Sequence, residues 1–218
     1  MIKAVIFDMD GLMFDSESLG LRIIEEVMND YPYKFDENLN KSIIGMNREL
    51  ARKEYCKMYD EAFPFDEFML KKHKKTMKYY DDFEVPKKPG LVELLTLLKQ
   101  ENISVGLATS TYREEAEFML KRAGVLDFFT ITVCGNEVEH SKPHPEIYEH
   151  ALSKLHVQAS EAIVLEDSEN GLRAAQAAGI STVFVKDLIT PCSDVLKGVT
   201  HQVETLHDVI TLIKNQGL

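Results

Sequence analysis

Five short apolar runs, rich in β-branched residues, recur along the chain at 3–7, 103–108, 130–134, 162–165 and 181–185. Runs of this length without polar alternation are typical of strands buried on both faces of a parallel sheet. Helical patterns follow most of them, at 91–99, 111–122, 145–154 and 171–178. Strands that alternate with helices predict an α/β fold, in which right-handed crossovers cover both faces of a doubly wound parallel sheet. Thr111 and Glu114 fit a capping box that would begin the second helix.

One long interval breaks this alternation. Residues 16–82 contain helical segments at 19–28, 48–58 and 65–80 but no convincing strand. The polar stretch 81–90 that follows contains two prolines, as linkers often do. We therefore expect two domains. Residues 1–15 and 83–218 form an α/β core, and residues 16–82 form an all-helical domain inserted after the first strand.

Charge and composition exclude several classes of partner. Lysine and arginine number 25 against 36 acidic residues, a net charge of −11, which argues against binding to nucleic acid or to an anionic membrane. No apolar run approaches the roughly 18 residues of a membrane span. The three cysteines are scattered and indicate neither a zinc site nor a disulfide framework. We expect a soluble, monomeric, cytoplasmic protein with no nucleic-acid or membrane partner.

Polar side chains follow four of the predicted strands. Ligands of open parallel sheets bind at the carboxyl ends of the strands, so these residues are the candidates for a functional site. They are, in chain order, Asp8, Asp10, Thr109, Ser110, Lys142, Glu166 and Asp167. Taken singly, each has an ordinary explanation as a turn residue, a helix cap or a surface side chain. Together, at four strand ends, they predict one site.

The chemistry of this set points to a cation and a phosphoryl group. Clustered carboxylates repel one another, and a dication lets them remain ionised together. Oxygen ligands of this kind suit Mg²⁺, so Asp8, Asp10, Glu166 and Asp167 are the candidate metal ligands. The Thr109 hydroxyl, the Ser110 backbone N–H at a helix start and the Lys142 ammonium would bind phosphoryl oxygens. These donors and this positive charge would lie at the same edge of the sheet as the carboxylates.

At these positions the chain resembles the haloacid-dehalogenase-like (HAD) superfamily of phosphohydrolases. Residues 5–17, VIFDMDGLMFDSE, match the first signature of that family, and the resemblance covers essentially the whole chain. Leu107-Ala108-Thr109, Lys142-Pro143 and Glu166-Asp167 match its three later motifs in order. The resemblance implies a Rossmann-like core, with residues 16–82 as the small helical cap domain.

The resemblance also implies a function for each matched residue. Asp8 would attack phosphorus and become an aspartyl phosphate, and Asp10 would act as general acid and base. Thr109 and Lys142 would hold the phosphoryl oxygens. Mg²⁺ would be bound by Asp8, Asp167 and the backbone carbonyl of Asp10, with Glu166 joining directly or through water.

We therefore expect a Mg²⁺-dependent phosphatase acting on a small phosphorylated metabolite of the sugar-phosphate or nucleotide class. A phosphomutase of the β-phosphoglucomutase type has the same fold, cap and catalytic residues and remains open. A non-catalytic binding protein on this fold is a further alternative, but such a protein would be expected to have lost one of the catalytic residues. In the insert, residues 45–49, GMNRE, resemble a substrate-contacting cap loop. Arg48 would bind a second anionic group there, or it is simply a solvated arginine.

Overall fold

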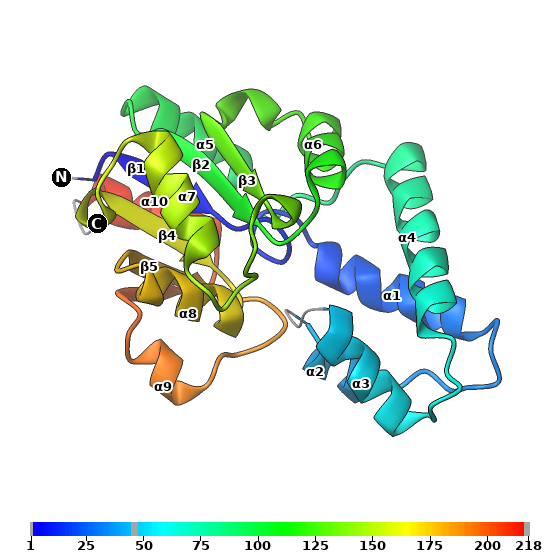
Figure 1. Cartoon of the computed structure of the whole chain (residues 1–218). Helices are drawn as coiled ribbons and strands as arrows, with labels where there is room; N and C mark the ends of the chain where they lie inside the picture. Colours follow the sequence, from blue (N-terminus) through cyan, green and yellow to red (C-terminus); the bar gives the residue numbers. More distant parts are fainter. Residues whose placement is uncertain (1, 45–47, 216–218) are drawn as a thin grey trace. The chain divides into compact units, whose positions relative to one another are not determined.

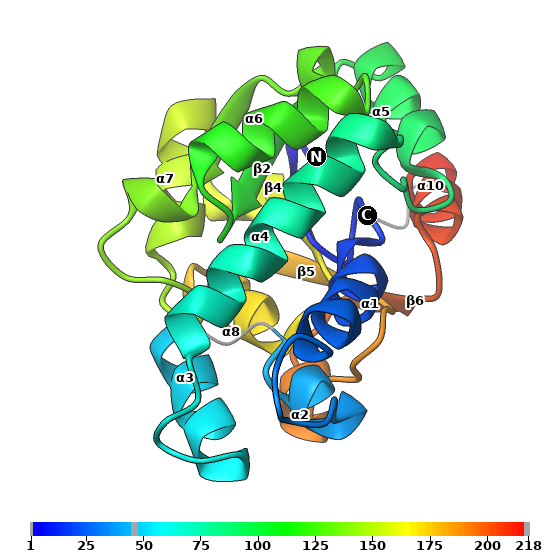
Figure 2. The same cartoon turned by 90° about the vertical axis from the view of Figure 1, so that its right-hand side faces the viewer.

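The computed structural model describes residues 2–44 and 48–215 and confirms the α/β class. Its parallel sheet has six strands in the order β3-β2-β1-β4-β5-β6. Figure 1 labels β1 to β5, and Figure 2 labels β6. The strands are β1 (Ala4–Phe7), β2 (Ser104–Thr109), β3 (Ile131–Cys134), β4 (Ala162–Glu166), β5 (Ser181–Val185) and β6 (His201–Val203). Five of these were predicted. Edge strand β6 was missed because it has only three residues, none of them buried, and therefore lacks an apolar run.

The strand order reverses at β1. The chain pairs β1 with β2 on one side and with β4 on the other, so a topological switch point lies between β1 and β4. Phe7 is in register with Leu107 and with Leu165. The next residues along the three strands, Asp8, Ala108 and Glu166, therefore emerge at the same level of the sheet's carboxyl edge.

Helices cover both faces of the sheet (Figures 1 and 2). Helices α7 (Glu146–Leu155) and α8 (Glu169–Ala177) pack on one face, where Ile6 and Val164 contribute to their shared core. The small residues Ala174 and Ala175 are fully buried in that core and let α8 approach the sheet closely. Helices α5 (Leu91–Gln100) and α10 (Leu206–Lys214) lie together on the opposite face. The remaining elements of this unit are α6 (Arg113–Arg122), α9 (Ser193–Leu196) and the 3₁₀ turns η1 (Leu126–Phe128), η2 (Gly135–Glu137) and η3 (Ala159–Glu161).

The predicted capping box at Thr111 is wrong. Helix α6 begins at Arg113, and the side chain of its N-cap residue, Tyr112, makes no capping hydrogen bond. The Arg113 backbone N–H instead donates to Asn136 Oδ1 at 3.1 Å. The Thr111 hydroxyl, free of a capping function, donates to Asp10. A tertiary contact has therefore replaced the local one that the sequence pattern suggested.

The chain divides into two compact units, residues 1–15 with 85–218 and residues 16–84. The second unit contains α1 (Ser16–Met28), α2 (Glu37–Ser42), α3 (Arg48–Met58) and α4 (Phe65–Asp82). Short α2 escaped prediction because ENLNKS carries a single apolar residue, Leu39. Helices α1 and α4 pack against each other (Figure 2). Aromatic rings fill the core near α3, where Tyr55 stacks on Phe63 with ring centroids 5.0 Å apart.

The longest helix, α4, has 18 residues and includes five lysines. Among residues 2–44 and 48–215, no helix combines the length and apolarity needed to cross a bilayer.

Candidate active site

Lys142 and Asp8 form the centre of a buried charged cluster at the switch point. Asp8 directly follows β1, and Lys142 lies in the loop between β3 and α7. The Lys142 ammonium donates to Asp8 Oδ1 at 2.6 Å, to Glu166 Oε1 at 2.7 Å and to the Ala108 carbonyl at 3.0 Å. All three charged side chains are buried. The structure thus brings together residues that are more than 130 positions apart in the sequence.

Glu166, the last residue of β4, is fully buried and fully satisfied by protein donors. Its Oε1 accepts from Lys142 and from the Tyr148 hydroxyl at 3.0 Å. Its Oε2 accepts from the Asp167 N–H at 3.0 Å and from the Ser168 N–H and hydroxyl, both at 2.9 Å. A Cβ on Gly171 would lie 1.6 Å from Glu166 Oε1, so only glycine at that position leaves room for the carboxylate.

Burial and pairing set the protonation states in this cluster. Burial raises the pKa of Asp8 to about 7, although the Lys142 cation opposes that rise. Burial alone would lower the pKa of Lys142, but the Asp8 and Glu166 carboxylates outweigh it and hold the pKa well above its ordinary value. Burial, reinforced by Glu166, raises the pKa of Tyr148, which keeps its hydroxyl a neutral donor. One cation therefore faces more than one carboxylate, and the cluster has an excess of negative charge.

Asp167 adds a further carboxylate to this excess. Carboxylate oxygens of Asp8, Glu166 and Asp167 lie within 4.8 Å of one another, and all three residues are buried. Gly11, at φ +83°, brings the turn after β1 so close that a Cβ there would lie 2.3 Å from Asp167 Oδ2. Such a tight set of buried oxygen donors fits a hard divalent cation such as Mg²⁺.

Asp10 is half-buried and is held by Thr111, whose hydroxyl donates to Asp10 Oδ2 at 2.7 Å. The buried Thr109 hydroxyl in turn accepts from the Thr111 N–H at 3.1 Å. Thr111 was missed as a site residue because its spacing to Glu114 suggested a helix cap. Ser110 is exposed, and its expected place at a helix start is wrong because α6 begins three residues later.

A fifth strand end supplies a carboxylate that the sequence analysis passed over. Asp187 comes two residues after β5, and its side chain is only 6% exposed. It pairs with Lys88, whose ammonium also lies 3.6 Å from Asp15. A Cβ on Gly11 would lie 2.8 Å from Asp187 Oδ2, so Asp187 borders the same turn as Asp167. Its position after a predicted strand was the signal that could have found it.

With this geometry in hand, comparison with known proteins identifies the family. The family model of the haloacid dehalogenase-like hydrolases matches residues 5–185. The chain belongs to this family. A phosphorylated carbohydrates phosphatase from Thermotoga maritima is 31% identical over 183 residues, which cover 84% of each chain. A β-phosphoglucomutase from Bacillus subtilis is 29% identical over 190 residues, covering 84% of this chain and 83% of that one.

Solved structures agree with this assignment. A candidate β-phosphoglucomutase from Thermotoga maritima superposes with a TM-score of 0.81 at 28% identity, covering 98% of this chain and 99% of that one. CbbY from Rhodobacter sphaeroides, solved with phosphate, has a TM-score of 0.80 at 24% identity, covers 96% of each chain and shows the shared fold. The expected family, the fold class and the assignment as an enzyme are confirmed.

In the helical unit of this haloacid dehalogenase-like hydrolase, Arg48 is the first residue of α3 and is exposed. Its guanidinium donates to Asp66 at 2.8 Å and lies 5.7 Å from the centre of the Phe65 ring. Arg52 pairs with the same carboxylate. Residues 45–47 of the predicted cap loop lie outside the described residues.

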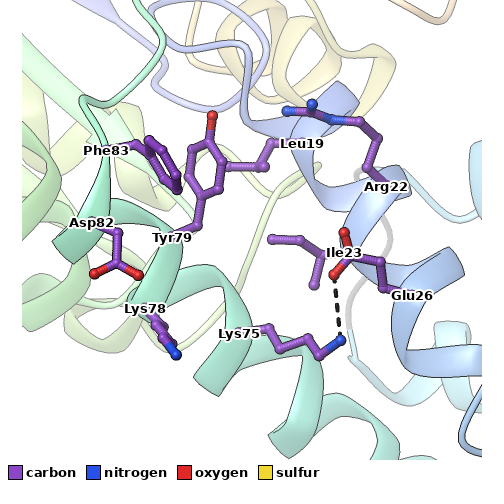
Figure 3. Close-up of a pocket in the computed structure, with 9 residues that line it drawn as sticks. All are labelled: Leu19, Arg22, Ile23, Glu26, Lys75, Lys78, Tyr79, Asp82 and Phe83. Carbon is purple, nitrogen blue, oxygen red and sulfur yellow. Dashed lines mark hydrogen bonds and ion pairs between the residues drawn. The ribbon is translucent and has the colours of Figure 1, made fainter.

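Helices α1 and α4 also border a pocket of about 290 Å³ (Figure 3). Leu19 and Ile23 are buried side chains of its lining, and the Lys75 ammonium lies 3.3 Å from Glu26 across it. The charged lining residues Arg22, Glu26, Lys75, Lys78 and Asp82 are all exposed. This pocket has none of the buried, convergent charge of the cluster around Lys142.

Proposed function

We propose that the chain is a Mg²⁺-dependent phosphatase that hydrolyses a small phosphorylated metabolite through an aspartyl phosphate on Asp8. The observation that carries this proposal is the buried Asp8–Lys142–Glu166 cluster at the switch point, with Asp167 beside it. Such a cluster costs free energy unless its charges are paired, and it supplies a carboxylate nucleophile together with a fixed positive charge. Membership of the hydrolase family supports the same conclusion.

In this proposal Asp8 attacks phosphorus, and Lys142 offsets the charge on the transferred phosphoryl oxygens. Glu166 keeps Lys142 in place. A carboxylate offers about four lone-pair positions, and Glu166 already accepts five hydrogen bonds. We therefore place Glu166 outside the direct ligands of the cation and make it a positioning residue.

Asp10 protonates the leaving oxygen and then takes a proton from the water that hydrolyses the aspartyl phosphate. Its hydrogen bond from Thr111 fixes the carboxylate while leaving Asp10 Oδ1 for the reacting group. The hydroxyl of Thr109, the last residue of β2, and the backbone N–H of Ser110 just after it bind phosphoryl oxygens.

The carboxylates of Asp8 and Asp167 and the backbone carbonyl of Asp10 would hold Mg²⁺. When bound, the cation neutralises charge on the phosphoryl group and orients it for in-line attack. The remaining steps belong to the side chains: Asp8 supplies the nucleophile, Lys142 the fixed charge, and Asp10 the proton transfer.

The substrate belongs to the sugar-phosphate or nucleotide class, and the helical unit acts as a cap that selects among such molecules. The T. maritima relative named for phosphorylated carbohydrates supports the sugar-phosphate class. Arg48 would bind a second anionic group of the substrate, provided that it exchanges its present partner, Asp66, for that group.

Release of phosphate from an aryl phosphate tests the proposal directly. We expect chelation to abolish turnover, Mg²⁺ to restore it and Ca²⁺ to substitute poorly, because its looser coordination shell would misplace the phosphoryl group. An Asp8→Asn variant should be inactive in Mg²⁺. Full activity in excess chelator would contradict the assignment of the cation.

A phosphomutase is the second candidate, favoured by the B. subtilis relative. The two functions differ in where the phosphoryl group goes, either to water or to another hydroxyl of a sugar phosphate. Incubating the enzyme with a hexose 1-phosphate and a catalytic amount of a hexose bisphosphate distinguishes them. Phosphorus NMR should show inorganic phosphate as the main product, whereas hexose 6-phosphate in its place would identify a mutase.

A further inference from the structure

A second group of potential metal ligands lies in the loop between β3 and α7 and at the first residue of α7, outside the carboxylate cluster. Ligand atoms of His140, His144 and Glu146 lie within 4.8 Å of one another. His140 Nδ1 is 2.8 Å and His144 Nδ1 is 3.9 Å from the same oxygen, Glu146 Oε2. The two imidazole rings lie side by side with centroids 4.5 Å apart.

The carboxylate of this group is already fixed in position. Glu146 Oε1 accepts from the Glu139 N–H at 2.7 Å, and Oε2 accepts from the His140 N–H at 2.9 Å. These hydrogen bonds, together with His140, lower the pKa of Glu146 to about 2, so the carboxylate is ionised. The two backbone contacts leave lone pairs on both oxygens. A carboxylate that is already held by the backbone N–H groups of Glu139 and His140 loses little freedom when it binds a cation.

We propose that His140, His144 and Glu146 form a site for a divalent transition metal, with Zn²⁺ as its representative. Bonds of about 2.0–2.1 Å in tetrahedral geometry place donor atoms roughly 3.3 Å apart. The distances of His140 Nδ1 and His144 Nδ1 from Glu146 Oε2, 2.8 and 3.9 Å, lie on either side of that value. Binding would replace the His140–Glu146 hydrogen bond, and the 3.3 Å hydrogen bond that His144 Nδ1 accepts from the Glu146 N–H, by metal–ligand bonds. The neutral His140 ring would then carry its proton on Nε2, which faces away from the metal.

Ligand chemistry separates this site from the carboxylate cluster. Two imidazoles and one carboxylate favour Zn²⁺, Ni²⁺ or Cu²⁺, whereas the buried all-oxygen set of Asp8 and Asp167 favours Mg²⁺. The three ligands are partly accessible, with side-chain exposures of 60% for His140, 49% for His144 and 16% for Glu146. Three protein ligands leave a fourth position for water.

The position of the site also ties it to the rest of the loop. His140 precedes Lys142 by two residues, and His144 follows it by two. A bound cation would therefore cross-link the loop on both sides of Lys142, whose ammonium donates to Asp8 and Glu166. The Lys142 side chain already has three partners, so the proposal requires no movement of that side chain.

Competition with a chromophoric chelator tests the site on the full chain, with Zn²⁺ as the probe and excess Mg²⁺ present to occupy the carboxylate cluster. We expect one Zn²⁺ per chain. His140→Ala and His144→Ala should each weaken binding by about 10–100-fold or more, since even indirect support of a ligand is worth that much. The matched control is His150→Ala, an exposed histidine on α7, which should bind as the wild type does.

Two further measurements keep the result independent of folding. Zn²⁺ should raise the Tm of the wild type but not that of the His140→Ala/His144→Ala double variant, because a ligand of the folded state stabilises it. In the wild type, Zn²⁺ should shift the imidazole NMR signals of His140 and His144 before those of other histidines. Wild-type affinity in the double variant, equal weakening by His150→Ala, or unshifted His140 and His144 signals at Zn²⁺ saturation would each overturn the proposal.

Discussion

The two units of the chain treat charge in opposite ways. The α/β unit buries Asp8, Lys142, Glu166 and Asp167 at one edge of its sheet. In the helical unit, over residues 16–44 and 48–84, the buried polar side chain is the neutral Asn40, which accepts a hydrogen bond from Tyr55. The charged side chains of that unit pair at its surface, as Arg48 and Arg52 do with Asp66.

The difference shows where function has overridden packing. A buried ion pair seldom stabilises a fold more than well-packed apolar side chains would, and a charge left without its partner is strongly destabilising. The helical unit avoids this cost with an aromatic core, in which Tyr55, Phe63 and Phe68 contact one another. The α/β unit accepts the cost at a single place, the carboxyl edge at the switch point. Charged residues occur throughout both units, so it is their burial, and not their presence, that identifies the site.

Replacement of the two aspartates after β1 should give the largest effects. Asp8→Asn removes the nucleophile, so we expect no phosphoenzyme and no turnover of any phosphate ester. Asp10→Asn removes the proton donor and the base, each of which typically contributes roughly 10²–10⁴-fold. An activated aryl phosphate needs little protonation of its leaving group, so it should still phosphorylate Asp8 in Asp10→Asn. The phosphoenzyme should then accumulate, with a burst of phenol release.

Intact-protein mass spectrometry after a rapid acid quench measures this accumulation. Phosphoenzyme in Asp8→Asn would contradict the assignment of the nucleophile. Equal losses for activated and unactivated esters in Asp10→Asn would contradict its assignment as the acid.

A smaller effect is expected from Thr111, whose hydroxyl donates to Asp10 while its backbone N–H donates to Thr109. Thr111→Val keeps the shape of the side chain but removes the hydroxyl, and we expect turnover of an alkyl phosphate to fall by about 10–100-fold as Asp10 loses its orientation. Thr111→Ser retains the hydroxyl and should restore most of that loss. Activated aryl phosphates should still phosphorylate Asp8 at the wild-type rate in both variants. Equal loss on both ester types would indicate that Thr111 serves only folding.

Thr111 also shows what the sequence could and could not predict. The buried strands β1 to β5 and the carboxylates that follow them were predictable, because apolar runs and strand ends depend on local pattern. The pairing of Lys142 with Asp8 required the sheet order, which brings distant segments to one edge. Thr111 and Glu114 fitted a local motif, but a tertiary hydrogen bond to Asp10 competed successfully for the same hydroxyl.

The same limit applies to β6 and α2, which carry too few apolar residues to show a period. Glu166 is a further case. Its spacing beside Asp167 suggested a metal ligand, while two of its five hydrogen bonds come from Lys142 and Tyr148, which only the fold brings into contact with it. Local pattern located the carboxylates, and three-dimensional contacts divided the functions among them.

Each unit has a fully buried tyrosine, so the stabilising effect of a buried hydrogen bond can be compared between the two units. The Tyr148 hydroxyl donates to the charged Glu166, and the Tyr55 hydroxyl donates to the neutral Asn40. Tyr148→Phe should lower the free energy of unfolding by about 1.5–3 kcal/mol, and Tyr55→Phe by about 0.5–1.5 kcal/mol, because hydrogen bonds to charged groups are the stronger class.

Hydrogen exchange resolved by residue reports the stability of each unit separately. Tyr148→Phe should reduce protection around β4 and α8, and Tyr55→Phe should do so around α2 and α3. The comparison between the units would fail if Tyr55→Phe lowered the free energy of unfolding more than Tyr148→Phe does.

The smallest change in stability is expected from Arg48→Ala, because Arg52 remains paired with Asp66. The two arginines, Arg52 foremost, lower the pKa of Asp66 to about 2, so their stabilisation is present at neutral pH and is lost as pH falls from about 4 towards 2. In Arg48→Ala we expect the pKa of Asp66, followed by carboxyl NMR, to rise yet stay below its ordinary value.

Activity should separate Arg48 from its neighbour. If Arg48 binds a second anionic group, Arg48→Ala should change the ratio of kcat/KM values between a sugar bisphosphate and a small aryl phosphate, while leaving aryl phosphate hydrolysis unchanged. Arg52→Ala is the matched control, since Arg52 contacts the same Asp66 carboxylate and the same Phe65 ring. An identical change of that ratio in both variants would assign the effect to Asp66 and the packing of the helical unit. A change confined to Arg48 would make an exposed charge, unlike the buried ones around Lys142, a determinant of substrate choice and not of catalysis.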